Sequence, residues 1–126
     1  MKLLLDTNAL IWLGQDHPRL TRAARDAIAA PTTVTLFSIV SLWEAAIKAR
    51  AHGLAADPAD LRRRALGADL TMLALTPAHL DALAQAPMLH RDPFDHLLIA
   101  QAMAEDATIV TADRMFPRYP FRLLAL

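Results

Sequence analysis

The sequence has 126 residues, the size of one domain, and 55% of them are hydrophobic, which excludes two independent cores and a disordered chain. Charged residues interrupt every apolar run before it reaches the roughly 18 residues of a membrane span, and zero cysteines exclude disulfides and thiolate metal sites. Thirteen Lys and Arg balance thirteen Asp and Glu, so no net charge attracts a polyanion to the whole molecule, and we expect a single cytoplasmic domain over residues 1–126.

The first half of the chain alternates strand and helix patterns. In chain order, it predicts a strand over residues 2–6, a helix over 8–13, a helix with an apolar stripe from Leu20 to Ile28, and a strand over 33–37. Ser38 or Ser41 then caps a helix that runs to about residue 52. The first strand contains Leu3-Leu4-Leu5 without alternation, which is typical of a strand covered on both faces of a parallel sheet.

The second half continues this alternation. It predicts a helix over residues 57–66, a strand over 71–75, a helix over 76–85, a helix over 94–105, a strand over 108–111 and a candidate edge strand over 121–124. Because parallel neighbours need a crossover connection that a helix usually fills, the sequence predicts an α/β layer sandwich with a mainly parallel central sheet flanked by helices. The run Arg62-Arg63-Arg64 is typical of a solvated helix face, with a phosphate contact as the alternative. Trp12 and Trp43 are expected in the core.

Two acidic residues follow predicted strands at the edge where parallel sheets bind ligands. Asp6 ends the first strand, and Asp113 follows the strand over 108–111 by two residues. Since ligands bind outside the carboxyl ends of strands in open α/β sheets, both carboxylates are expected on the same rim. Glu44 and Asp95 lie on predicted helices among apolar neighbours, which is an unusual setting for an acid.

Each of these acids also has a structural explanation. Ser41 and Glu44 match a capping box, and Glu44 and Lys48 have the spacing of an ion pair within a helix. Asp95 stands in the first turn after an Asp92 cap, where a carboxylate favours the helix dipole. The other two acids can cap the helices that follow them. Four acids that enter one rim from four elements would nevertheless repel one another unless a cation neutralised them.

The ligand types select the cation. With oxygen donors and no thiolate, the site favours a hard ion, Mg²⁺ or alternatively Mn²⁺, held by carboxylates, waters and a substrate phosphate. Zinc is disfavoured because no two of the five histidines have the His-x-x-x-His spacing beside a Glu. The chain also lacks a Gly-x-Ser-x-Gly elbow, a Gly-rich phosphate loop and a dinucleotide fingerprint.

Four segments, in order along nearly the whole chain, together resemble a known family. They are LLLDTNALIW from Leu3, SIVSLWEAAIK from Ser38, HRDPFDHLLIAQA from His90 and IVTADRMF from Ile109. With these segments the chain resembles the PIN-domain ribonuclease toxins of the VapC type. The resemblance implies a PIN-like three-layer sandwich.

The resemblance also implies an activity and partners. Such a protein is a magnesium-dependent endoribonuclease and the toxin of a type II toxin–antitoxin pair. It forms a homodimer and is inhibited by a small antitoxin whose tail enters the active-site groove. Its acidic site corresponds to Asp6, Glu44, Asp95 and Asp113.

Further positions follow from the same resemblance. Thr7 and Thr111 correspond to hydroxyls that orient carboxylates or water. Asn8 stands where His is frequent, and His96 stands where Arg is common, so a basic substrate contact at position 96 becomes weaker or pH dependent.

The mechanistic hypothesis assigns roles to these acids. A bound magnesium ion would supply a water of lowered pKa and relief of the charge that develops on the phosphoryl group. Asp6 and Asp95 are the predicted main metal ligands, and Glu44 and Asp113 complete the charge and orient waters. The candidates for contacts with RNA phosphates are the basic residues near the acids in sequence: Lys48, Arg91, His96, Arg114 and Arg118.

Two hypotheses from other classes stay open. A phosphatase of the haloacid dehalogenase type also begins with an apolar strand that ends in Asp, but it normally has a second Asp two residues on, where this chain has Asn8. The chain could instead be a non-catalytic RNA-binding or protein-binding module whose acids are only helix caps. A phosphatase assay tests the first alternative, and the absence of stabilisation by magnesium would favour the second.

Overall fold

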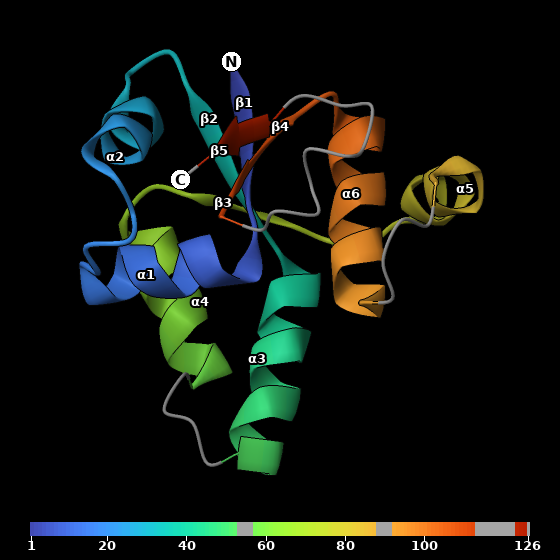
Figure 1. Ribbon diagram of the computed structural model, residues 1–126, viewed down its shortest axis with the longest axis horizontal. Helices are drawn as coiled ribbons and strands as arrows, with labels where there is room; N and C mark the ends of the chain where they lie inside the picture. Colours follow the sequence, from blue (N-terminus) through green and yellow to red (C-terminus); the bar gives the residue numbers. More distant parts are fainter. Residues whose placement is uncertain (53–56, 88–91, 113–122, 126) are drawn as a thin grey trace.

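Strands and helices alternate through the residues that the computed structural model describes, which are 1–52, 57–87, 92–112 and 123–125 (Figure 1). The strands are β1 (Lys2–Leu5), β2 (Val34–Ser38), β3 (Thr71–Leu73), β4 (Thr108–Thr111) and β5 (Leu123–Ala125). The helices are α1 (Thr7–Gln15), α2 (Arg22–Ala29), α3 (Ile39–His52), α4 (Pro58–Gly67), α5 (Pro77–Gln85) and α6 (Pro93–Glu105). No helix among these residues is long and apolar enough to cross a membrane.

The strands form one parallel sheet in the order β3-β2-β1-β4-β5. At the centre, Leu4 of β1 is in register with Leu36 of β2 and Ile109 of β4. Because every pairing is parallel, the C-terminal ends of all strands lie at one edge of the sheet. The prediction of a mainly parallel sheet is confirmed, and β5 occupies the edge position expected for the last strand.

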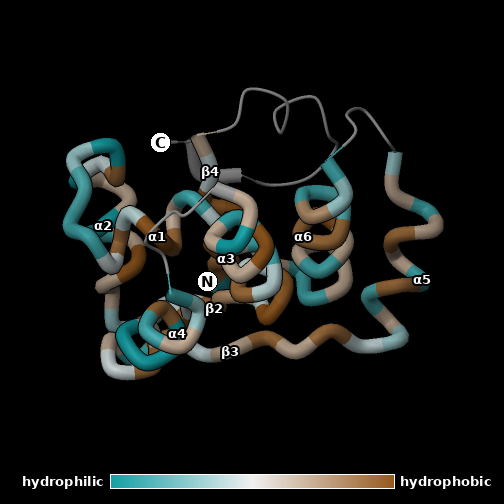
Figure 2. The backbone as a smooth tube through the Cα atoms, turned by 90° about the horizontal axis from the view of Figure 1, so that it is seen from below, coloured by the Kyte–Doolittle hydropathy of each residue, from teal (hydrophilic) through white to brown (hydrophobic). Residues whose placement is uncertain are grey.

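Alternate residues of β1 enter different cores. Leu3 and Leu5 pack with buried side chains of α1, α2, α3 and α4, whereas Leu4 packs with Leu36, Ile109 and side chains of α6. All three leucines of β1 are fully buried, as expected for a central strand covered on both faces. Figures 1 and 2 show α1, α2 and α4 on one side of the sheet and α6 on the other, with α5 outside α6. The predicted three-layer sandwich is therefore confirmed.

Two local expectations are wrong. The strand predicted over residues 71–75 ends at Leu73, because β3 pairs only with Leu36 to Ser38 of β2 and its ladder stops where β2 stops. Trp43 is not in the core: 54% of it is exposed, on the same stripe of α3 as Ile39 and Ile47. These three residues recur every four positions, so they share a helix face that points away from the sheet.

A buried polar contact joins the helices that carry two of the predicted acids. Ser38 ends β2, and its hydroxyl accepts a hydrogen bond from the backbone N–H of Val40 at 3.0 Å, which caps α3. The same hydroxyl donates to the side-chain carbonyl of Gln101 in α6. Ser38 and Gln101 are both fully buried, so this bond fixes the start of α3 against α6 without competition from water.

Candidate active site

Asp6 links the carboxyl ends of the two central strands. It follows β1 directly and caps α1, because its Oδ1 accepts the backbone N–H of Ala9 at 2.8 Å. Its Oδ2 accepts the hydroxyl of Thr111, the last residue of β4, at 2.6 Å. Its own N–H continues the ladder by donating to the carbonyl of Val110 at 3.1 Å. The carboxylate is only 6% exposed, so these donors hold it in one orientation at the rim of the sheet.

Glu44 is hydrogen-bonded to Thr7, the residue that follows Asp6 in the sequence. The hydroxyl of Thr7 donates to Oε1 of Glu44 at 2.6 Å, and the ammonium of Lys48 lies 2.6 Å from Oε2. Glu44 is only 3% exposed. A carboxylate is rarely buried to this extent unless it is paired, and the Thr7 hydroxyl and the Lys48 ammonium provide the pairing. The helix α3 therefore brings this acid to the start of α1, next to the end of β1.

Asp95 stands at the N-terminus of α6. Asp92 caps this helix by accepting the backbone N–H groups of Phe94 at 2.9 Å and Asp95 at 3.3 Å, and Pro93 occupies the first helical position. The start of α6 lies against α3, where the ring of Phe94 meets the ring of Trp43 edge to face with centroids 5.0 Å apart. Since Trp43 precedes Glu44 and Phe94 precedes Asp95, this ring contact places the two acidic segments side by side.

The pKa of Lys48 reflects the negative charges around it. Its hydrogen bond with Glu44, together with the negative charges of Glu44, Asp92 and Asp95, raises the pKa of Lys48 above its ordinary value, although partial burial opposes the shift. Carboxylates from α3 and α6 thus act on one cation. Three carboxylates act on Lys48 even though the chain as a whole has no net charge.

The remaining predicted residues differ in their placement. Asn8 is exposed, His96 is buried in α6 with 6% exposure, and Lys48 is half exposed but paired with Glu44. Asp113 and the RNA-contact candidates Arg91, Arg114 and Arg118 lie outside the described residues. Within the described ranges, no three His, Asp or Glu side chains are grouped closely enough to hold a metal ion by themselves.

Of the two caps that the sequence offered for α3, Ser38 is the one that forms, and the capping box of Ser41 and Glu44 does not. Ser41 and Glu44 match a capping box, but α3 begins at Ile39 and Ser38 provides the cap, so both residues lie inside the helix. Ser41 is fully buried, and its hydroxyl lies 2.9 Å from that of Thr7. The sequence signal for this contact was a serine one helical turn before an acid, both among apolar neighbours.

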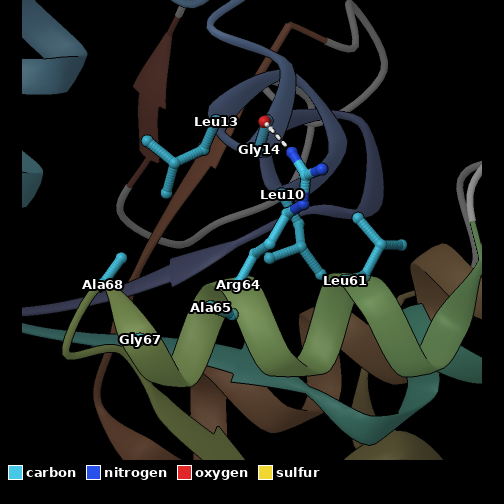
Figure 3. Close-up of a pocket in the computed structure, with 8 residues that line it drawn as sticks. All are labelled: Leu10, Leu13, Gly14, Leu61, Arg64, Ala65, Gly67 and Ala68. Atoms are coloured by element: carbon cyan, nitrogen blue, oxygen red, sulfur yellow. Dashed lines mark hydrogen bonds between the residues drawn. The ribbon is translucent and has the colours of Figure 1, made fainter.

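A separate hollow of about 390 Å³ lies between α1 and α4 (Figure 3). It is lined by Leu10, Leu13 and Gly14 of α1 and by Leu61, Arg64 and Ala65 of α4, and it includes none of the predicted acids. Arg64 donates to the carbonyl of Gly14 at 3.0 Å and pairs with Asp60, to which Arg63 also binds. Of the three consecutive arginines, these two therefore have structural partners within the chain.

The donor set fits a hard divalent cation. Asp6, Glu44 and Asp95 offer carboxylate oxygens, the ligands that Mg²⁺ and Mn²⁺ prefer. Asp6 and Glu44 are buried and held by hydroxyl donors, Thr111 and Thr7, which orient carboxylates as the outer partners of metal sites do. By donor type these residues suit such an ion, and among the described residues they do not form a group of three that would hold it without further ligands.

Comparison with known proteins identifies the family. The model of the PIN domain family matches residues 3–122. The search of curated proteins finds no match to this chain.

Solved structures with the same fold come from toxin–antitoxin systems. The chain is similar to the VapBC2 complex of Rickettsia felis bound to a DNA fragment from its promoter, with a TM-score of 0.76, 19% identity, and 99% of this chain and 98% of that chain covered. It is also similar to DNA-bound VapBC of Salmonella typhimurium, with a TM-score of 0.70, 20% identity and coverages of 99% and 98%. A third similar structure is VapC20 of Mycobacterium tuberculosis, a toxin that cleaves the sarcin-ricin loop, with a TM-score of 0.65, 16% identity and coverages of 92% and 93%. At these identities the likenesses show a common fold, and since the family model spans nearly the whole sequence, the chain belongs to the PIN domain family.

Proposed function

We propose that this protein is a magnesium-dependent endoribonuclease and the toxin of a toxin–antitoxin pair. The observation that carries the proposal is that the buried carboxylate Glu44 is hydrogen-bonded to Thr7, the residue next to the buried Asp6 at the carboxyl edge of the sheet, in a PIN-domain chain. The similar structures support it, because they are toxin–antitoxin complexes and an RNA-cleaving toxin. The non-catalytic alternative treats the acids as helix caps, whereas Glu44 lies inside α3, which Ser38 caps.

The residues of the site would act as follows. Asp6 and Asp95 would hold the ion, directly or through water, and Glu44 and Asp113 would add negative charge and orient waters. When bound, the magnesium ion supplies a water of lowered pKa and an electrophile for the phosphoryl oxygen. The hydroxyls of Thr111 and Thr7 hold Asp6 and Glu44 in fixed orientations, which limits the reorganisation needed during hydrolysis.

The decisive experiment replaces Asp6 by Asn. Asparagine caps helices as well as aspartate does, so Asp6→Asn keeps the cap on α1 while it removes one charge from the metal site. We expect cleavage of an RNA mixture in Mg²⁺ to fall by at least about 100-fold, with an unchanged far-UV spectrum. Sequencing of the RNA ends identifies the cleaved bonds.

The matched control is Asp57→Asn, which makes the same change at the cap of α4, where Asp57 accepts the N–H of Ala59. This variant should cleave RNA at the wild-type rate, and EDTA should abolish cleavage by both proteins. Full activity of Asp6→Asn, or of the wild type in EDTA, would exclude the proposed mechanism. Hydrolysis of small phosphate esters without RNA cleavage would favour the phosphatase alternative instead.

The proposed partners follow from the same comparisons. Since the similar structures include complexes with antitoxins, we expect a small cognate antitoxin to bind this chain and suppress cleavage. Production of the chain alone should arrest growth, and production of Asp6→Asn should not. Growth arrest by both proteins would show that toxicity does not depend on the carboxylates.

A homodimer is also part of the proposal. The exposed stripe Ile39, Trp43 and Ile47 on α3 offers an apolar surface of the kind that pairs subunits, and the absence of net charge favours self-association. Size-exclusion chromatography with light scattering measures the subunit number. A single-subunit mass at all protein concentrations tested would contradict the dimer.

A further inference from the structure

The hydroxyls of Ser41 and Thr7 and the carboxylate of Glu44 form a buried series of hydrogen bonds at the proposed site. The Thr7 hydroxyl lies 2.6 Å from Oε1 of Glu44 and 2.9 Å from the hydroxyl of Ser41. The contacts join residues 34 and 37 positions apart in sequence, so they exist only because α1 and α3 pack together. Exposure is 0% for Ser41, 5% for Thr7 and 3% for Glu44.

The chemistry of these groups fixes the direction of the hydrogen bonds. An ionised carboxylate only accepts, and a hydroxyl carries a single proton. Thr7 must therefore donate its proton to Glu44, and this short bond to a charged oxygen is of the stronger kind. Thr7 then accepts the proton of Ser41, which polarises the Thr7 hydroxyl and strengthens its bond to Glu44.

Because they are buried, the hydroxyls of Ser41 and Thr7 determine the orientation of the Glu44 side chain. Lys48 binds the second oxygen, Oε2, from a half-exposed position, whereas the Ser41 and Thr7 side hardly meets solvent. Water could replace Lys48 but has little access to replace the hydroxyls. The rotamer of Glu44 is consequently set from the buried side.

We propose that Ser41 is a positioning residue of this enzyme, which acts through the hydroxyl of Thr7 to hold Glu44 in its working orientation. The inference rests on the proposed nuclease function and adds a residue to it. Ser41 itself does not touch the RNA or the ion. Its removal should slow the chemical step and leave RNA binding intact.

The test compares Ser41→Ala, Thr7→Val and Thr7→Ser in RNA cleavage with Mg²⁺. Thr7→Val keeps the shape but loses a hydrogen bond to a charged group, so kcat should fall by about 10- to 100-fold. Ser41→Ala loses a bond between neutral groups, and kcat should fall by about fivefold. Thr7→Ser retains the hydroxyl and should keep most of the activity. KM for RNA should stay within about twofold in all three variants.

A double variant separates positioning from a merely structural effect. If Ser41 acts through Thr7, adding Ser41→Ala to Thr7→Val should cause little further loss of kcat, whereas independent effects would multiply. The matched control is Thr35→Val, which removes another buried hydroxyl whose only described contact is the Ile28 carbonyl at 3.5 Å, and it should keep wild-type kcat. Alanine favours helices, so α3 should persist in Ser41→Ala.

Either wild-type kcat in Ser41→Ala or multiplied losses in the double variant would overturn the role of Ser41. In both cases, loss of cleavage in Asp6→Asn would still support the nuclease. If the wild type cleaves no RNA in Mg²⁺, the proposed function fails, and the role of Ser41 fails with it.

Discussion

Lys48 and Glu44 form an ion pair at the proposed site. Glu44 is almost fully buried, whereas the Lys48 side chain is 48% exposed, so the pair joins a desolvated carboxylate to a partly hydrated cation. The partnership raises the pKa of Lys48, chiefly through the hydrogen bond to Glu44. A group whose pKa is higher in the folded state stabilises the fold fully below its unfolded value of 10.5, and the contribution disappears as the pH rises through the folded value.

Replacing Lys48 by Met should therefore destabilise the metal-free protein near neutral pH. Removing one partner of a buried charge pair is costly, but solvent reaches Lys48, so we expect a loss of about 1–2 kcal/mol in the free energy of unfolding. Urea unfolding in EDTA measures this difference, which should shrink above pH 10.5. The control Lys2→Met removes a 3.9 Å pair with the Glu105 carboxylate and a 3.1 Å hydrogen bond to the Glu105 carbonyl, between partly exposed side chains, and should cost less. Equal losses in the two variants would contradict the special role of Lys48.

The N-terminus of α6 shows how one helix cap positions an acid of the proposed site, Asp95. Asp92 binds the first N–H groups of this helix, and Pro93 favours its first turn, so Asp95 stands in a turn with a defined start. The helix α5 has a similar start, where Thr76 and His79 form a capping box, but α5 lies outside α6 and away from the sheet edge (Figure 1). The two caps are thus comparable in structure and different in their relation to the site.

This difference predicts how the two caps respond to alanine. Asp92→Ala and Thr76→Ala should each lower the free energy of unfolding by about 1 kcal/mol, as loss of a cap usually does. Only Asp92→Ala should also reduce RNA cleavage, because it releases the turn that holds Asp95. Asp92→Ser, which retains a capping oxygen without the charge, should restore stability. Equal effects of the two alanine variants on cleavage would show that the cap does not position the acid.

The central strand, β1, contributes side chains to both hydrophobic cores of the molecule. Leu4 fills the core beneath α6, and its neighbours Leu3 and Leu5 fill the core beneath α1, α2, α3 and α4. Both helical layers therefore depend on the three leucines of β1. The same strand ends at Asp6, so the stability of the sheet and the placement of the site share one element.

Leu4→Ala should accordingly destabilise the protein by about 2–5 kcal/mol, since it removes a fully buried side chain and leaves a cavity. Leu80→Ala is the matched control, because Leu80 is 49% exposed on α5 and should change stability by about 0.5 kcal/mol or less. Chemical denaturation followed by circular dichroism compares them. Similar losses would show that the central strand is not the main source of stability.

The sequence by itself determined the order of elements, the parallel sheet and the position of Asp6 at its edge. These features follow from local patterns: the unbroken Leu3-Leu4-Leu5 run, the caps at Thr76 and Asp92, and the alternation of strands with helices. Such patterns act over a few residues, so they can be recognised before the chain is folded.

Only the tertiary structure decided the partners of the acids. Thr111 reaches Asp6 across 105 residues, and Ser41 reaches Thr7 across 34, because parallel strands and packed helices bring distant segments to one rim. Locally, Ser41 and Glu44 matched a capping box, but burial against α1 turned them inward and gave Glu44 the Thr7 hydroxyl instead. Trp43, by contrast, faces outward, because the side of α3 that carries Leu42 and Ala45 packs against the core. Which side chains meet depends on how whole elements cross, and that information is absent from short stretches of sequence.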